Sequence, residues 1–141
     1  MISITRLLEF DAGHRVLNHE GKCHTLHGHR YKVEVEATSK YLDPLGRVID
    51  FSEVKMRLGS WLDENWDHTC VFYEKDQEAL DAFHSMSGRK DCYLLPVNPT
   101  AENMAHYLLN KICPKLFKDS EVQIIKITIW ETPNCRAECS T

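Results

Sequence analysis

The sequence predicts an α+β fold in which an antiparallel sheet carries two helices on one face. Apolar and polar residues alternate in segments 2–16 and 27–38 near the N-terminus, and again in segment 122–130 near the C-terminus. Between them, apolar residues recur at helical spacing in segments 53–65 and 101–113. Alternation indicates strands with one solvent-exposed face, whereas a 3.6-residue spacing indicates amphipathic helices. Grouped strands and grouped helices, in the order strand, strand, helix, helix, strand, strand, are typical of the α+β class.

The two N-terminal strands are separated by a polar loop over residues 17–25. The first strand spans 2–16, and we expect a bulge where two apolar residues are adjacent at Leu7–Leu8. The second strand spans 27–38 and places Tyr31, Val33 and Val35 on one side, opposite a charged side.

The first predicted helix spans 53–65, and Asp50 or Ser52 supplies its N-cap. A shorter helix is expected at 78–86, followed by a short apolar run at 92–97. The second long helix spans 101–113, with Thr100 as N-cap and Pro114 ending it. The strand at 122–130 is followed by a turn, and residues 135–139 return as a short edge strand.

Composition points to one soluble, compact domain over residues 1–141. The chain is 43% hydrophobic and carries a net charge of −4, so it lacks the basic surface of a nucleic-acid-binding protein. It contains neither a secretory-type apolar leader nor a membrane-spanning stretch, and we therefore expect a cytoplasmic protein with reduced cysteines and no membrane partner. The open edges of a four-stranded sheet favour a closed homo-oligomer.

Three histidines form a candidate metal site. His27 and His29 are two residues apart on a strand, so their imidazoles point to the same face. His14, on the preceding strand, reaches the same ion if the two strands pair. Three imidazoles with one open position are typical of catalytic zinc, although copper, iron or nickel would also suit them. The alternative is that His27 and His29 are ordinary polar residues of a half-buried strand.

Further candidates lie outside the strand pair. Cys23 precedes His27 by four residues, and its thiolate could be a fourth ligand, a nucleophile or a general base. Asp67 and His68 are adjacent, as in a proton shuttle, or are simply a polar helix exit. Glu131 at a strand end can accept two hydrogen bonds from a guanine-like N–H edge. Glu102 in a first helical turn has the simpler role of opposing the helix dipole.

Together these residues resemble the family of 6-pyruvoyl- and 6-carboxy-tetrahydropterin synthases over essentially the whole chain. The matching pieces are Phe10-Asp11-Ala12-Gly13-His14, Cys23 with His27-Gly28-His29, Val48-Ile49-Asp50-Phe51, Asp67-His68, Pro99-Thr100-Ala101-Glu102-Asn103 and Glu131. The resemblance implies the tunnelling fold (T-fold), in which trimers form a continuous β-barrel. Two trimers stack as a homohexamer with active sites between subunits.

The resemblance also implies roles for the candidate residues. His14, His27 and His29 would hold one zinc ion per subunit, Cys23 would abstract a proton, and Asp67 with His68 would be its relay. Glu131 would anchor the pterin ring, helped by Thr100, Ala101 and Glu102. Arg15, Lys22 and Arg30 are candidates for contacting a triphosphate.

The three residues between Cys23 and His27 are similar to the spacing in the 6-carboxy enzymes of queuosine (7-deazaguanine) biosynthesis. The implied reaction converts 7,8-dihydroneopterin triphosphate to 6-carboxy-5,6,7,8-tetrahydropterin, acetaldehyde and triphosphate. Three alternatives stay open: a pyruvoyl-forming synthase, a non-catalytic module whose zinc is closed by Cys23, and a zinc hydrolase.

Overall fold

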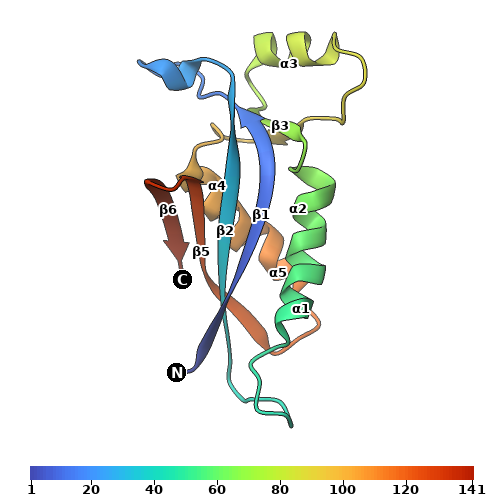
Figure 1. Cartoon of the computed structure of the whole chain (residues 1–141), viewed down its shortest axis with the longest axis vertical. Coiled ribbons are helices and arrows are strands. Elements are labelled where there is room, and N and C mark those ends of the chain that lie inside the picture. The colour runs from blue at the N-terminus through green and yellow to red at the C-terminus, as the bar shows by residue number, and fades with distance from the viewer.

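A six-stranded mixed sheet forms the centre of the protein, in the strand order β4-β3-β1-β2-β5-β6. The computed structural model describes residues 1–141 (Figure 1). The strands are β1 Ser3–His14, β2 His27–Ser39, β3 Thr69–Tyr73, β4 Tyr93–Leu95, β5 Val122–Thr132 and β6 Cys135–Ser140. The predicted α+β class is confirmed, and the four strands β1, β2, β5 and β6 pair antiparallel as expected.

The pairing of β1 with β2 runs without interruption from Ser3 opposite Thr38 to His14 opposite His27. The expected bulge at Leu7–Leu8 is therefore wrong. Leu8 is buried, whereas Leu7 points to the opposite face and is 47% exposed. Two adjacent apolar residues in this strand simply serve its two faces, because strand side chains alternate.

Two short strands, β3 and β4, extend the sheet and make it mixed. β3 pairs parallel with β1, and β4 pairs parallel with β3. Segment 69–73 is a strand that the sequence analysis did not identify, while β4 lies within the apolar run at 92–97. Parallel pairing requires a crossover connection. The helical segment from α1 (Phe51–Val54) to α2 (Ser60–Asn65) lies in the first crossover, and α3 (Gln77–His84) supplies the second.

Both long helices are confirmed, with small differences at their ends. The first runs through α1 Phe51–Val54, a π-helical segment Lys55–Gly59 and α2 Ser60–Asn65, and Asp50 caps it by accepting a hydrogen bond from the Ser52 N–H at 2.8 Å. The second runs through α4 Ala101–Tyr107, a π-helical segment Leu108–Ile112 and α5 Cys113–Leu116.

The expectation that Pro114 ends the second helix is wrong, because the helix continues to Leu116. Pro114 lies in the first turn of α5, directly after the π-helical segment. A proline is tolerated there because the missing N–H belongs to a turn whose hydrogen bonds are already rearranged. The short third helix, α3 Gln77–His84, matches the expected helix at 78–86.

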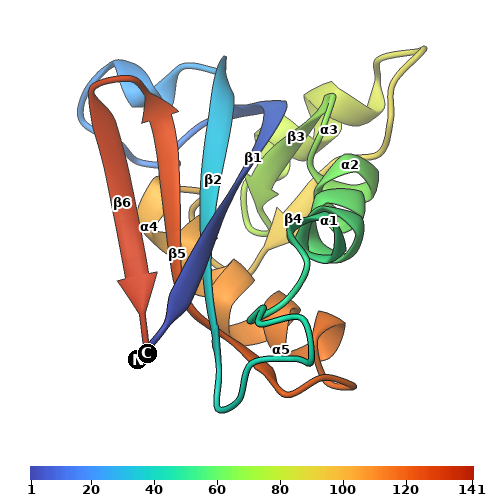
Figure 2. The ribbon, with the colours of Figure 1, turned by 60° about the horizontal axis from the view of Figure 1, so that its bottom comes forward.

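The long helices cover one face of the sheet and leave the other face open (Figures 1 and 2). Phe10 of β1 and Tyr31 of β2 are fully buried on the covered face, with ring centroids 4.9 Å apart. On the open face, Arg30 forms ion pairs with Glu9 and Asp11. No helix is both long enough and apolar enough to span a bilayer. The covered face is also the face that carries His14, by the same alternation of side chains along β1.

Candidate metal centre and active site

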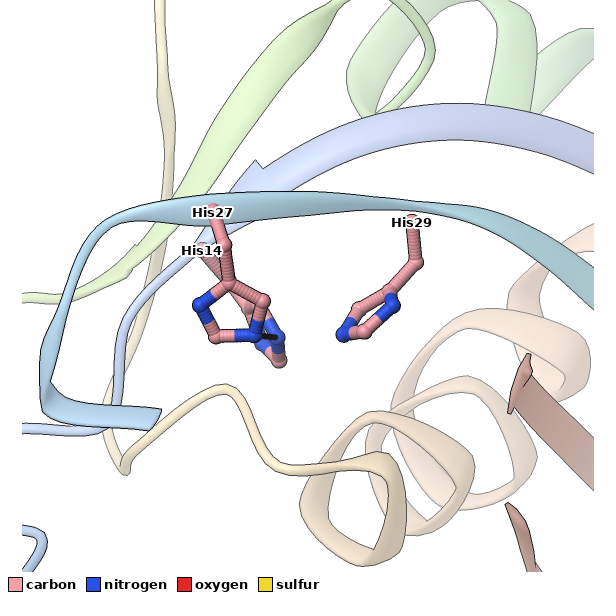
Figure 3. A group of neighbouring side chains, drawn as sticks. All are labelled: His14, His27 and His29. Atoms are coloured by element: carbon pink, nitrogen blue, oxygen red, sulfur yellow. Dashed lines mark hydrogen bonds between the residues drawn. The ribbon is translucent and has the colours of Figure 1, made fainter. Parts of the chain in front are cut away.

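Three imidazoles converge at one end of the covered face (Figure 3). His14 is directly opposite His27 in the β1–β2 register, and His29 follows two residues later on the same face. The Nε2 atoms of His14 and His27 are 3.1 Å apart. One ring nitrogen from each of the three residues lies within 4.8 Å of the other two. The structure brings the three predicted histidines together, and the group could hold a metal ion.

Backbone carbonyls orient two of these rings. His14 Nδ1 lies 2.7 Å from the Pro99 carbonyl oxygen, and His27 Nδ1 lies 2.6 Å from the Thr25 carbonyl oxygen. A carbonyl only accepts, so each Nδ1 carries a hydrogen and each Nε2 is turned toward the other histidines. His29 Nε2 is buried and has no hydrogen-bond partner. A cation between the three rings would give the His29 nitrogen the partner that it lacks.

Burial favours the neutral, metal-binding form of two of these imidazoles, His14 and His29. Desolvation lowers the pKa of His14 to about 4, against the opposing effect of its hydrogen bond to Pro99, and the nearby His27 and His29 lower it further. Burial also lowers the pKa of His29. Three imidazoles match the donor set of a catalytic zinc site, so the residues present fit such an ion.

Glu131 joins the same site. It lies where the β5–β6 register shifts between Trp130 and Thr132, and such irregularities re-aim side chains. Its carboxylate oxygens lie 4.0 Å from His14 Nε2 and 3.9 Å from His29 Nε2. The side chain is 24% exposed, so it is within reach of both the metal position and a ligand from solvent.

The electrostatics of Glu131 connect the start of α4 to the site. Burial raises the pKa of the Glu131 carboxyl, and the charge of Glu102 raises it further, against a lowering effect of His27. Thr100 caps α4 by accepting a hydrogen bond from the Asn103 N–H at 3.2 Å, as expected. Glu102, in the first turn of α4, therefore lies near enough to Glu131 for its charge to act on that carboxyl.

Cys23 lies in a 3-10 turn, Lys22–His24, within the loop between β1 and β2. Its carbonyl oxygen accepts a hydrogen bond from the Val16 N–H at 2.9 Å, and its side chain is half-buried. This bond closes the loop and holds the Cys23 backbone against Val16, two residues after His14. The Cys23 sulfur is not part of the group formed by the three histidines.

Asp67 and His68 form the expected pair, with 2.7 Å between Asp67 Oδ2 and His68 Nδ1. Asp67 Oδ1 also accepts the Asp11 N–H at 2.9 Å. Burial raises the Asp67 pKa, but the bonds from Asp11 and His68 outweigh it and hold the pKa below its usual value. The carboxylate therefore fixes the His68 proton on Nδ1 and leaves Nε2 free, on a side chain that is 75% exposed.

The structure does not bring this pair to the three histidines of the same chain. Asp67 and His68 cluster with the carboxylate of Asp11, and Asp11 differs from His14 by an odd number of positions on β1. The side chains of Asp11 and His14 therefore project from opposite faces of the sheet. A pocket of about 570 Å³ on the Asp11 side is lined in part by His68, Cys70 and Arg89.

Two of the three basic candidates are engaged elsewhere. Arg15 forms a bidentate pair with the buried Asp76, and Arg30 pairs with acids on the open face. Lys22 stays beside Cys23 in the same turn.

Sequence reasoning missed the residues that orient the histidines through their backbone. The carbonyls of Pro99 and Thr25 act through atoms that every residue has, so residue type carries no signal for them. Asn98 is a further omission, and its amide holds the backbone of Leu17. An asparagine two residues before the predicted N-cap Thr100 was the one available signal, because asparagine favours turns and caps.

Comparisons with known proteins identify the family of this chain. A family model described as 6-pyruvoyl tetrahydropterin synthase matches residues 3–141. A "6-carboxy-5,6,7,8-tetrahydropterin synthase" of Rickettsia bellii (strain RML369-C) is 46% identical over 138 residues, which cover 98% of this chain and 99% of that protein. A protein of the same name from Haemophilus influenzae is 28% identical over 144 residues, 98% of each chain.

Solved structures show the same fold. An uncharacterized protein from Wolinella succinogenes superposes with a TM-score of 0.80 at 23% identity, covering 99% of this chain and 98% of that chain. The 6-pyruvoyl tetrahydropterin synthase of Caenorhabditis elegans superposes with a TM-score of 0.65 at 26% identity, covering 99% and 95%. The protein therefore belongs to the 6-pyruvoyl tetrahydropterin synthase family.

Proposed function

We propose that this protein is a zinc-dependent lyase that converts 7,8-dihydroneopterin triphosphate and water to 6-carboxy-5,6,7,8-tetrahydropterin, acetaldehyde and triphosphate. The observation that carries the proposal is the convergent group of His14, His27 and His29. It occurs in a chain that matches proteins named 6-carboxy-5,6,7,8-tetrahydropterin synthase over nearly its full length. We place the product in queuosine (7-deazaguanine) biosynthesis, on the resemblance described above.

Zinc bound by the three imidazoles, one ion per subunit, supplies a Lewis acid for the side-chain hydroxyls of the substrate. Glu131 accepts hydrogen bonds from the N–H edge of the pterin ring. Its partial burial strengthens such bonds, because the surrounding dielectric is lower than that of water. Thr100, Ala101 and Glu102 at the start of α4 complete the pterin site.

Cys23 serves as the base that removes a proton from the substrate side chain, and the Asp67–His68 pair receives and returns protons. Asp67 holds the His68 imidazole with Nε2 free to accept, which is the form a general base requires. The pair projects from the face of the sheet opposite the histidine group. We therefore assign it to the active site of a neighbouring subunit, within a hexamer made of two trimers.

The first test is to incubate the zinc-loaded protein with 7,8-dihydroneopterin triphosphate and to assay acetaldehyde together with the pterin product. Acetaldehyde with 6-carboxy-tetrahydropterin is the expected result. A pyruvoyl product would transfer the assignment to the pyruvoyl-forming synthases. No consumption by a zinc-loaded, intact oligomer would overturn the substrate assignment.

Cys23→Ala separates a base from a metal ligand. A lost base leaves the zinc content unchanged while turnover falls by roughly 10²- to 10⁴-fold. A lost ligand lowers zinc affinity and stability together, which would favour the non-catalytic zinc module. Cys92→Ala, at another half-buried cysteine, is the matched control and is expected to keep both zinc and turnover.

Mixing two inactive variants tests the shared site. Cys23→Ala and His68→Ala chains, unfolded and refolded together, place an intact Cys23 and an intact His68 around some sites if these come from different subunits. Random assembly restores about a quarter of the wild-type activity. No recovery in a mixed oligomer of correct size would contradict the assignment to neighbouring subunits.

A further inference from the structure

The side chain of Asn98 pairs with both backbone groups of Leu17. The Leu17 N–H donates to Asn98 Oδ1 at 2.9 Å, and Asn98 Nδ2 donates to the Leu17 carbonyl oxygen at 3.1 Å. Two such bonds between one amide and one residue imitate the exchange between paired strands. Leu17 lies outside any strand, so this two-bond contact supplies the pairing that the backbone of the loop otherwise lacks.

Each end of this contact adjoins a group of the candidate active site. Pro99, the residue after Asn98, holds His14 Nδ1 through its carbonyl oxygen at 2.7 Å. Val16, the residue before Leu17, donates its N–H to the Cys23 carbonyl oxygen at 2.9 Å. One side chain therefore connects the carbonyl that orients a metal-binding histidine with the loop that carries the thiol.

Asn98 is itself fixed to the start of α4. Its carbonyl oxygen accepts the Thr100 N–H at 2.9 Å and Asn103 Nδ2 at 3.0 Å. α4 packs against β5 and β6. Asn98 therefore attaches the loop to a helix that is itself packed on the sheet. Contacts anchored on a helix position a site more precisely than contacts between loops.

We propose that Asn98 is a positioning residue that sets the distance between the Cys23 thiol and the histidine group. The proposal rests on the proposed function only for the role of Cys23 in turnover. Asparagine suits the task because its amide donates and accepts at once. Aspartate keeps the bond from the Leu17 N–H but turns a second acceptor toward the Leu17 carbonyl, and alanine leaves both backbone groups without a partner.

The test compares Asn98→Ala and Asn98→Asp with Asn110→Ala. Asn110 is the matched control, because its Nδ2 donates to the His106 carbonyl at 3.0 Å, away from the site. We expect both Asn98 variants to retain zinc and to lose kcat, by up to about 10²-fold for alanine, with KM changed much less. We expect the kcat of Asn98→Asp, which keeps one of the two hydrogen bonds, to lie between that of Asn98→Ala and that of the wild type.

Two readouts do not depend on the substrate assignment. The first is the rate of Cys23 alkylation by iodoacetamide, measured by peptide mass spectrometry against the exposed Cys135 of the same chain. The second is the visible spectrum of the cobalt-substituted protein, which reports the orientation of the histidine ligands. We expect both to change in the Asn98 variants and to stay at wild-type values in Asn110→Ala.

Unchanged Cys23 alkylation and an unchanged cobalt spectrum in Asn98→Ala would overturn the proposal, whatever the stability of the variant. An equal loss of kcat in Asn110→Ala would also overturn it, because general destabilisation would then account for the effect. If Asn98→Ala does not fold, Asn98→Asp decides by the same readouts. A wild-type protein that does not turn over the pterin refutes the proposed function alone, since alkylation and the cobalt spectrum still test the contact.

Discussion

Replacing His29 by leucine is expected to leave the metal-free protein at least as stable as the wild type, while abolishing its stabilisation by zinc. The reason is the unpartnered, buried Nε2 of His29. An unsatisfied buried polar atom costs about 1–3 kcal/mol, and leucine removes that cost while filling a similar volume. An ordinary packed histidine would show the opposite result, a loss of stability on substitution.

The zinc response sets the scale of the measurement. A ligand at about 1,000 times its Kd stabilises the folded state by roughly 4 kcal/mol. At about 2–4 °C per kcal/mol for a chain of this size, the wild-type Tm rises by on the order of 10 °C. His29→Leu is expected to lose most of this rise, because two imidazoles bind zinc far more weakly than three.

The assay is thermal and urea unfolding of both proteins, first stripped with a chelator and then loaded with zinc. If zinc raises the Tm of His29→Leu as much as that of the wild type, His29 is not a ligand. If the metal-free variant is less stable than the metal-free wild type by about 2 kcal/mol or more, the reasoning from the unpartnered nitrogen is refuted.

Three further results are expected. Because burial lowers the pKa of His14 from 6.5 to about 4, the unfolded chain binds more protons than the folded chain between these values. Stability is therefore full above pH 6.5 and falls by about 3 kcal/mol toward pH 4; urea unfolding of the metal-free protein across this range measures it, and His14→Gln should remove this part of the slope. Arg15→Met leaves Asp76, which is 2% exposed, as an uncompensated buried charge, and we expect a loss of about 3–5 kcal/mol in urea unfolding; a loss near zero would contradict this. A Cβ added at Gly13 would lie 2.8 Å from the Cys70 sulfur, so Gly13→Ala should cost about 1–3 kcal/mol. Adding Cys70→Ala should relieve part of that cost, and strictly additive losses would argue against the contact.

The strands and long helices could be predicted because their periodicity is local. Tyr31, Val33 and Val35 alternate along β2, and all three are fully buried. The strand at 69–73 escaped prediction because it has only five residues. A mostly apolar run this short shows no periodicity that separates a strand from a buried helical segment. Its parallel pairing with β1 depends on the crossover through α1 and α2, which no local pattern contains.

The histidine group could also be predicted, because strand geometry fixes which face a side chain takes. Residues 27 and 29 share a face on any regular strand, and pairing through the 17–25 loop brings His14 opposite His27. The Leu7–Leu8 bulge was wrong for a related reason. Two adjacent apolar residues are compatible with a bulge, or with a regular strand that places one of them on each face of the sheet. The pairing register with the neighbouring strand shows which of the two occurs.

Asp67 and His68 show where sequence adjacency is insufficient. The pair forms as expected, but His68 has a positive φ of 58°, and the Asp67 carboxylate binds the backbone of Asp11. These contacts place the pair beyond the open face of β1, away from the histidines of the same chain. That placement follows from how β3 joins the sheet, and adjacency in sequence does not contain it.

The sequence by itself determined the class of fold, the two long helices, the family and the three-histidine group, because each depends on residue type at short, fixed spacing. Tertiary structure alone decided which carbonyls orient the rings, how Glu131 reaches His14 and His29, and how Asn98 connects Pro99 to the Cys23 loop. These features depend on backbone atoms, which every residue shares, and on contacts between segments more than 80 residues apart. Such contacts form only when the folded chain brings the segments together.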